Sequence, residues 1–248
     1  MNATTQPTHS ASRAPDGESE HEPNCLPADR AIAIERVGLI AMDMDSTAIS
    51  IECIDEIADF AGVKAEVSAI TAAAMRGELD FQASLMRRVA CLEGLSVKVL
   101  DEVYNDRLKA SSGLAELVAY AQKHDVKTML VSGGFTFFTE RMRRQFGYTY
   151  TRANTLGEHD GKLTGKVCGA IVDAAEKKRL LLSLAATLPA DRRSTVALGD
   201  GANDVPMLLA ATLGVAVHAK PAVRQQLPVA INTGGLDALI ELLPSRRL

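Results

Sequence analysis

Aspartate, serine and glycine residues follow several short apolar runs of this 248-residue sequence, at places where buried strands would end. Asp43 and Asp45 follow the first run, and Asp200 follows a later one. Two carboxylates at positions i and i+2 of a strand point to the same side, and a third adds the oxygen ligands and negative charge that a hard divalent cation needs. The three aspartates therefore predict a metal site, with Mg²⁺ as its natural occupant.

An anion site is expected beside the metal. Ser132 and Gly133 lie where a strand turns into a helix, so a hydroxyl and backbone N–H groups would face an anion at the positive end of the helix dipole. Lys177, which opens a predicted helix, adds a flexible point charge for phosphate. Its neighbours Lys178 and Arg179 leave open that this cluster is only a solvated helix face, or that Lys178 supplies the amine.

These groups suit phosphoryl transfer to an aspartate. A carboxylate can attack phosphorus and form an acyl phosphate, which divides one difficult hydrolysis into two displacements. Mg²⁺, a lysine and amide donors would stabilise the charge that develops. The second aspartate of the pair would first protonate the departing alkoxide and then act as a base on water. Its proton is favoured because the neighbouring carboxylate and a bound dianion oppose further negative charge.

Other motifs with similar residues do not fit. The segment that starts at Asp43 is not an EF-hand loop, because position 6 is Ala48 rather than Gly and position 12 is Ile54 rather than Glu. No GxxxxGK[ST] motif occurs, no GxGxxG follows the first strand and no GxSxG surrounds Ser132. A P-loop, a dinucleotide fingerprint and a serine-hydrolase elbow are therefore excluded.

The elements that position these residues alternate between strand and helix. Apolar runs bounded by Gly, Asp or Ser predict buried parallel strands at 37–42, 126–131, 195–198 and 213–217. Helical patterns that would cover both faces of the sheet lie at 114–123, 136–146, 176–188 and 205–211. The predicted fold class is α/β, with a doubly wound, Rossmann-like parallel sheet.

Two stretches depart from this alternation. In residues 163–172, apolar and polar side chains alternate and glycines occur, which predicts an antiparallel ribbon beside the sheet. Residues 53–108 carry helical periods without a convincing strand, which predicts an inserted all-helical cap over the carboxyl ends of the strands. Within it, Asp80 is the expected N-cap of a helix with one apolar face made by Phe81, Leu85, Val89 and Leu92.

The first 36 residues differ from the rest. They hold 4 of the 9 prolines, with 6 acidic and 3 basic residues and no sustained apolar period, so a disordered tail is expected at 1–36. The tail carries −3 of the net charge of −4, which leaves a nearly neutral body at 37–248.

Composition excludes several classes of partner. A body without net positive charge, with 4% aromatic residues and no Trp, lacks the surface that grips nucleic acids. No unbroken apolar run reaches the length of about 20 residues that a membrane span needs, and no secretory signal pattern is present. The four cysteines stand far apart, as in a reduced cytoplasmic chain. A small-molecule substrate is the expected partner, and the sequence predicts no oligomeric state.

Taken together and in their order, these motifs resemble the signature motifs of the haloacid dehalogenase superfamily, and more closely those of its phosphoserine phosphatase family. The segments that carry the resemblance are DMDST (43–47), IECIDE (51–56), VSGGFT (131–136), GDGAND (199–204) and AKP (219–221). The likeness covers residues 37–243. It implies a core of the haloacid dehalogenase type with a small helical cap inserted at about 53–108. It also implies hydrolysis of O-phospho-L-serine through an aspartyl-phosphate, the last step of serine biosynthesis.

The resemblance also implies roles for the aspartates. Asp43 would be the phosphorylated nucleophile and Asp45 the general acid and base. Mg²⁺ would be held by the side chains of Asp43 and Asp200 and the backbone carbonyl of Asp45, with Asp204 acting through a metal-bound water.

Contacts with the substrate follow from the same resemblance. Glu52 would bind the ammonium group of the substrate and Arg88 its carboxylate, a pair that selects a zwitterion over other phosphomonoesters. Met75 and Phe81 would close the apolar side of the pocket. The phosphoryl group would be bound by Ser132, Gly133, Lys177 and Asn203.

Alternatives remain open at two of these positions and for the function. Arg87 adjoins Arg88, although the spacing from the first apolar residue of the helix favours Arg88. Asp55 and Glu56 are near rivals of Glu52. The alternative functions are a phosphatase or phosphotransferase for another small metabolite, such as phosphohomoserine, and a non-catalytic phosphate-binding protein.

Overall fold

A computed structural model describes residues 23–75 and 78–245. Within them, one seven-stranded sheet has the order β4-β3-β2-β1-β5-β6-β7. The neighbouring strands run parallel except for β3 and β4. The strands are β1 (Val37–Met42), β2 (Lys127–Phe135), β3 (Tyr150–His159), β4 (Lys162–Cys168), β5 (Ser194–Gly199), β6 (Leu213–Val217) and β7 (Val229–Ile231).

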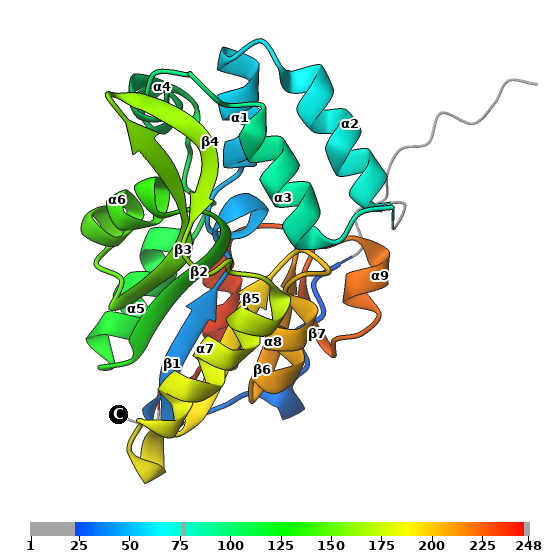
Figure 1. Ribbon diagram of the computed structural model, residues 1–248. Coiled ribbons are helices and arrows are strands. Elements are labelled where there is room, and N and C mark those ends of the chain that lie inside the picture. The colour runs from blue at the N-terminus through cyan, green and yellow to red at the C-terminus, as the bar shows by residue number, and fades with distance from the viewer. Residues whose placement is uncertain (1–22, 76–77, 246–248) are drawn as a thin grey trace, which may run out of the picture.

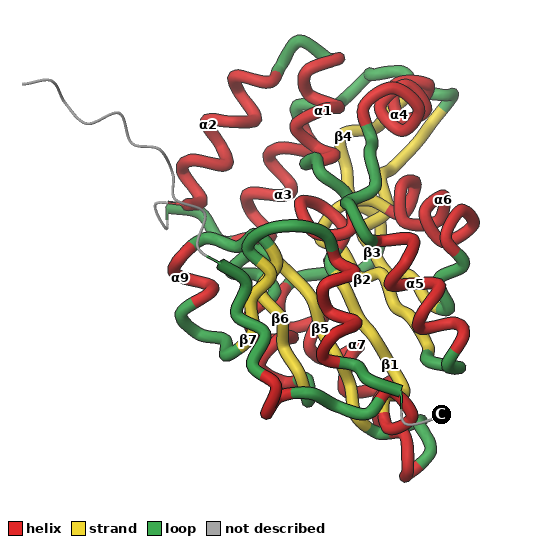
Figure 2. The backbone as a smooth tube through the Cα atoms, turned by 180° about the vertical axis from the view of Figure 1, so that it is seen from behind, coloured by secondary structure: helices red, strands yellow, loops and turns green. Residues whose placement is uncertain are grey.

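Alternate residues of the central strand β1 enter two separate cores. Ile40 and Met42 pack on the face that is covered by α5 (Leu114–Lys123) and α6 (Thr136–Phe146). Leu39 and Ala41 belong to the core on the opposite face, under α7 (Ala174–Ala186) and α8 (Val205–Ala210). Figure 1 shows α7 and α8 in front of the sheet, and Figure 2 shows α5 on the other side. Because β1 is buried on both faces, it reads as a continuous apolar run. The predicted doubly wound α/β class is confirmed.

The four predicted parallel strands correspond to β1, β2, β5 and β6, but the sequence analysis missed β3 and β7. The predicted ribbon exists, yet it is made by β3 and β4 and ends at residue 168, so its first strand lies before the stretch in which it was expected. Asp160 and Gly161, with φ of 49° and 73°, form the tight connection. The strand β3 is hard to predict from the sequence because many of its residues are polar. It begins beside β2 and continues into the exposed ribbon.

A helical layer lies beyond the carboxyl ends of the strands (Figure 1). Its helices are α1 (Cys53–Phe60), α2 (Lys64–Met75), α3 (Phe81–Ala90) and α4 (Lys98–Glu102). Asp80 caps α3 as expected, because its Oδ1 accepts a hydrogen bond of 2.7 Å from the Ala83 N–H. This layer falls within the stretch interpreted as an inserted cap; its bounds as a domain stay a prediction.

The described part of the predicted tail is packed, which corrects the expectation of disorder for residues 23–36. The Cys25 N–H donates to the Ala230 carbonyl at 2.8 Å and the Ala230 N–H donates back at 2.9 Å, so this segment adds a bridge to the edge of β7. Ile34 is fully buried in the main core. Pairing with an open sheet edge and burial of one apolar side chain therefore hold in place a segment whose composition is typical of a loop. Residues 1–22 of the predicted tail lie outside the described residues.

The remaining α-helix of the described residues is α9 (Pro221–Arg224). Among the helices of residues 23–75 and 78–245, none combines the length and the apolar character that crossing a bilayer requires.

Candidate active site

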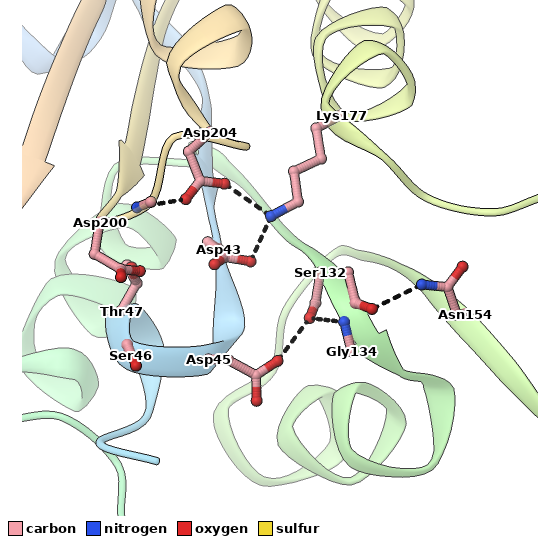
Figure 3. Close-up of polar contacts among 12 residues, drawn as sticks. Asp43, Asp45, Ser46, Thr47, Ser132, Gly134, Asn154, Lys177, Asp200 and Asp204 are labelled. Carbon is pink, nitrogen blue, oxygen red and sulfur yellow. Dashed lines mark hydrogen bonds and ion pairs between the residues drawn. The ribbon is translucent and has the colours of Figure 1, made fainter. Parts of the chain in front are cut away.

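Asp43 is the first residue after β1, and the chain then turns sharply through Met44–Ala48. The Ala48 N–H donates to the Asp43 carbonyl at 3.3 Å, and Ser46 takes a φ of 56°, a left-handed conformation that few residues other than glycine adopt. Asp45 is therefore placed by this turn. The expectation that two carboxylates of one strand point the same way was wrong, because the strand ends at Met42. Figure 3 shows Asp43 and Asp45 leaving the segment in different directions.

Lys177 lies between two carboxylates. Its Nζ is 2.7 Å from Asp43 Oδ1 and 2.7 Å from Asp204 Oδ1, and all three side chains are at least nine-tenths buried (Figure 3). The lysine sits one turn into α7, whose N-cap Asp173 accepts a hydrogen bond from the Glu176 N–H at 2.9 Å. Lys178 is exposed on the same helix. The structure thus brings Lys177, and not Lys178, to the aspartates.

Burial sets the charge balance of this cluster. It raises the pKa of Asp43 well above its usual value; Asp204 adds to the rise, and Lys177 opposes it. Burial alone would lower the pKa of Lys177, but the attraction of Asp204 and Asp43 outweighs that effect and raises it. The ammonium group therefore stays charged, and the neighbouring carboxyl groups outnumber it.

A metal ion would find three carboxylates here. Asp43, Asp200 and Asp204 each offer one oxygen atom, and these atoms lie within 4.8 Å of one another. Thr47 Oγ1 donates to Asp200 Oδ1 at 2.8 Å, while burial raises the pKa of Asp200 to about 6. Oxygen donors alone, with one ammonium group against three carboxylates, fit a hard divalent cation.

The metal side of this cluster adjoins a cavity of about 370 Å³. Ser46 and Asp200 form one part of its wall, and Ser111 and His218 form another. The cluster is therefore within reach of water and small solutes from this side.

Asp45 faces residues 132–134, near the end of β2. Its Oδ1 accepts a hydrogen bond from the Cys53 N–H at 2.9 Å, and its Oδ2 accepts one from Ser132 Oγ at 3.1 Å. Burial raises the pKa of Asp45, and these two hydrogen bonds partly offset the rise. Gly134 lets the groups come this close, because a Cβ there would lie 2.5 Å from Asp45 Oδ2. A carboxyl group with a raised pKa, held in place but reachable, suits a proton donor and acceptor.

Glu52 and Arg88 lie on the cap side of the site. Ser46 Oγ donates to Glu52 Oε1 at 2.7 Å. Although Glu52 as a residue is exposed, its carboxyl group is surrounded by protein atoms, and this together with the charge of Asp45 raises its pKa to about 7. Arg88 is half-buried and feels the negative charge of Asp55, Glu52 and Asp45, whereas Arg87 is exposed.

The other predicted contacts are divided. Phe81, at the start of α3, lies over Gly133: a Cβ on that glycine would be 2.9 Å from the ring atom Cζ of Phe81. Asn203 packs against Gly201 at the end of β5. Met75 is the last residue of α2, and its side chain lies outside what the structure describes.

Three residues around the site were missed by the sequence analysis. Thr47 holds Asp200, as described above. Asn154 lies on β3 and donates to the Gly133 carbonyl at 2.7 Å. Gln82 of α3 donates to Asp173 Oδ2 at 3.0 Å, which joins the cap side to the helix of Lys177. Nothing in the sequence marks Asn154, because the strand that buries it was not predicted, and nothing marks Gln82.

The chain is similar to known hydrolases. The family model of haloacid dehalogenase-like hydrolases matches residues 40–209. A curated phosphoserine phosphatase from Polaromonas sp. is 55% identical over 210 residues, which are 83% of this chain and 89% of that protein.

Two solved structures are similar in fold. A probable phosphoserine phosphatase from Vibrio cholerae, in unliganded form, has a TM-score of 0.78 and 44% identity, covering 87% of this chain and 67% of that one. A phospho-aspartyl intermediate analogue of phosphoserine phosphatase has a TM-score of 0.76 and 34% identity, covering 84% and 100%.

Proposed function

This chain belongs to the haloacid dehalogenase-like hydrolase family, and from its likeness to phosphoserine phosphatases we infer that it hydrolyses O-phospho-L-serine to L-serine and phosphate. The observation that carries this function is the likeness to phosphoserine phosphatases across more than four-fifths of the chain. Hydrolysis of phosphoserine releases free serine, so the reaction completes serine biosynthesis.

We propose Mg²⁺ as the cofactor, held by the side chains of Asp43 and Asp200 and the backbone carbonyl of Asp45, with Asp204 acting through a bound water. The grouping of the three side-chain carboxylates and their excess negative charge support this assignment. When bound, the ion would neutralise the carboxylates and withdraw charge from the phosphoryl oxygens.

In the first displacement, Asp43 is the nucleophile. Lys177 holds one oxygen of Asp43, and the other oxygen attacks phosphorus while the bond from phosphorus to the serine oxygen breaks. Asp45 starts protonated, which its raised pKa favours, and gives its proton to the departing serine oxygen. Ser132, Gly133, Asn203 and Lys177 bind the phosphoryl oxygens.

In the second displacement, the roles reverse. Asp45, now a carboxylate, takes a proton from water, and the oxygen of that water attacks phosphorus. The bond from phosphorus to Asp43 breaks, so the carboxylate is restored and phosphate leaves.

Selection of the amino acid head would rest on two charges. Arg88 offers a planar two-pronged donor for the substrate carboxylate, and Glu52 offers a carboxylate for the ammonium group. The attraction of Arg88 to Asp55, Glu52 and Asp45 supports its place beside the site, and Phe81 would cover the substrate from the cap. Met75 stays a prediction for the same wall.

We place the reaction in the cytoplasm. All four cysteines carry free thiols, as expected in a reducing compartment.

An assay of phosphate release tests the function and the metal together. With Mg²⁺ we expect kcat/KM to be higher for phosphoserine than for phosphohomoserine or p-nitrophenyl phosphate, and we expect EDTA to abolish turnover until Mg²⁺ is restored. A preference for a phosphomonoester without the amino acid head would refute the substrate. Full activity in EDTA would refute the metal site.

A further inference from the structure

Residues 132–134, here called the phosphate loop, interrupt the hydrogen-bond ladder between β2 and β3. Val131 pairs with Arg152, and the next pair is Phe135 with Asn154. Three residues of β2, numbers 132–134, therefore stand opposite one residue of β3. A bulge of this kind releases backbone groups from the ladder and aims them elsewhere. The released backbone also needs another support.

Asn154 supplies that support with its side chain. It is 1% exposed, its Nδ2 donates to the Gly133 carbonyl at 2.7 Å, and its Oδ1 accepts from the Val172 N–H at 2.8 Å. The amide orientation is fixed by these partners, since one is an acceptor and the other a donor. Asparagine is unusual inside a strand, and burial of its amide is tolerated because both ends are bonded.

One arm of the amide leads to the general acid and base. The Gly133 carbonyl belongs to the same peptide group as the Gly134 N–H, which donates to Ser132 Oγ at 2.7 Å. Ser132 Oγ in turn donates to Asp45 Oδ2 at 3.1 Å. Figure 3 shows this series running from Asn154 to Asp45. Hydrogen bonds in series polarise one another, so each bond strengthens the next.

The other arm leads to the lysine. Val172 immediately precedes Asp173, the N-cap of α7, and Lys177 follows one turn later with its contact to Asp43. The Val172 carbonyl also lies near Gly133: a Cβ on that glycine would be 3.7 Å from it. A single buried side chain thus joins the two segments that would hold the phosphoryl group from different sides.

We propose that Asn154 is a positioning residue that fixes residues 132–134 relative to the helix of Lys177, and so shapes the phosphoryl site for any phosphomonoester. The inference rests on the proposed function only in that this loop must bind the phosphoryl group. It concerns no part of the amino acid head.

Two variants separate the contacts of the amide. Asn154→Leu keeps the approximate shape but leaves both backbone partners unsatisfied. Asn154→Asp keeps the acceptor for Val172 but turns an oxygen toward the Gly133 carbonyl, so it breaks one contact only. If the leucine variant does not fold, the aspartate variant decides the question.

The matched control lies at the start of β2, beside the residue that precedes β3 and away from the site. Thr128 is 1% exposed; its Oγ1 accepts from the Thr149 N–H at 3.2 Å, and Thr149 Oγ1 accepts from the Thr128 N–H at 3.2 Å. Thr128→Val removes a comparable buried contact between side chain and backbone.

The experiment measures kcat and KM for phosphoserine and p-nitrophenyl phosphate, and the inhibition constant of inorganic phosphate, per mole of folded enzyme. For both Asn154 variants we expect kcat/KM to fall about 100-fold with both substrates, the usual cost of a misplacement near 1 Å. We expect the inhibition constant of phosphate to rise about tenfold, the size of one hydrogen bond to a charged group. Thr128→Val should lower the melting temperature without these kinetic changes.

Three results would overturn the proposal. The Asn154 variants could keep the wild-type kcat/KM. They could lose no more than Thr128→Val, which would indicate general loosening. They could lose activity with phosphoserine alone, which would place their effect on the amino acid head. Because p-nitrophenyl phosphate and inorganic phosphate report on the phosphoryl site directly, the outcome is independent of whether phosphoserine is the preferred substrate.

Discussion

Lys177 is an ammonium group with almost no exposure to water, held by carboxylates on two sides. Breaking a buried ion pair by removing one partner is costly, because the other charge is left uncompensated. Lys177 nevertheless pairs with Asp43 and Asp204, and Asp200 is a third carboxyl group beside them. Burial raises the pKa of Asp43. A raised pKa means that the ionised form of Asp43 destabilises the fold at neutral pH.

Asp43→Asn should therefore separate activity from stability. We expect kcat to fall by about 10⁴-fold or more and the acid-stable label on the phosphoenzyme to disappear, since the attacking oxygen is gone. The melting temperature in EDTA should stay the same or rise, because Lys177 keeps Asp204 as its partner while one buried carboxylate is removed. Rapid-quench labelling and thermal melts make the two measurements.

The exposed Asp191 gives the control for this variant, as Asp191→Asn should leave both quantities unchanged. Residual turnover of Asp43→Asn near the wild-type level would contradict its assignment as nucleophile.

Single residues were predictable where chemistry and topology coincide. Asp43 and Asp200 follow strands and Ser132 lies near the end of one, and the carboxyl ends of parallel strands meet at one edge. Thr47 and Asn154 were not predicted, because their work is to hold other groups and hydroxyl and amide side chains occur throughout any sequence. The choice between Lys177 and Lys178 needed the helix phase, which sequence spacing alone left open.

At the scale of elements, the two faces of α3 have different tasks. Leu85 and Val89 are buried, Arg87 is exposed, and Arg88 is half-buried. The basic pair in the sequence is thus divided by the 3.6-residue period of the helix.

Arg88→Ala should weaken the enzyme selectively. We expect kcat/KM for phosphoserine to fall by an amount equal to about 2–5 kcal/mol, the range for removing one partner of a desolvated charge pair. Kinetics with p-nitrophenyl phosphate, which has no carboxylate, should change little. Arg87→Ala is the matched control and should behave as wild type with both substrates.

An equal loss with the two substrates would contradict a role of Arg88 in selectivity. It would point instead to a general effect on the position of α3 above the sheet.

Helices and strands with a clear hydrophobic period in the sequence were predicted well. Elements that are ordered mainly by contacts with distant segments were not. The helices at 114–123 and 136–146 match the structure at both ends. The strand β3 was missed because its polar residues serve the exposed ribbon, and β7 because it has three residues. Local pattern does not reveal an edge that a distant segment will pair with.

At the scale of the whole molecule, the segment before β1 belongs to the fold. It bridges β7 through Cys25 and buries Ile34, so it joins the start of the chain to residues near its end. The predicted boundary at residue 36 followed composition, which does not record this long-range pairing.

Two truncations and one substitution measure that contribution. A chain that starts at residue 37 should melt about 5–15 °C below one that starts at residue 23, because it lacks the bridge and about 2–4 kcal/mol of apolar burial. Ile34→Ala should account for much of the difference, since emptying a buried isoleucine site costs about 2–5 kcal/mol. Equal melting temperatures of the two truncated chains would show that the segment adds nothing.

The place of β1 in the middle of the sheet also decides when the enzyme can become active during its synthesis. The Asp43 N–H donates to the Leu198 carbonyl at 3.0 Å, so the strand that carries the nucleophile waits for a partner made in the last quarter of the chain. Until the ribosome has delivered β5 and the aspartates after it, one edge of β1 is unpaired and the carboxylate cluster does not exist. Long-range parallel pairing of this kind folds slowly and exposes apolar strand edges in the meantime. This edge of β1 thus stays unpaired over most of the synthesis of the chain, and catalysis begins only near the completion of translation.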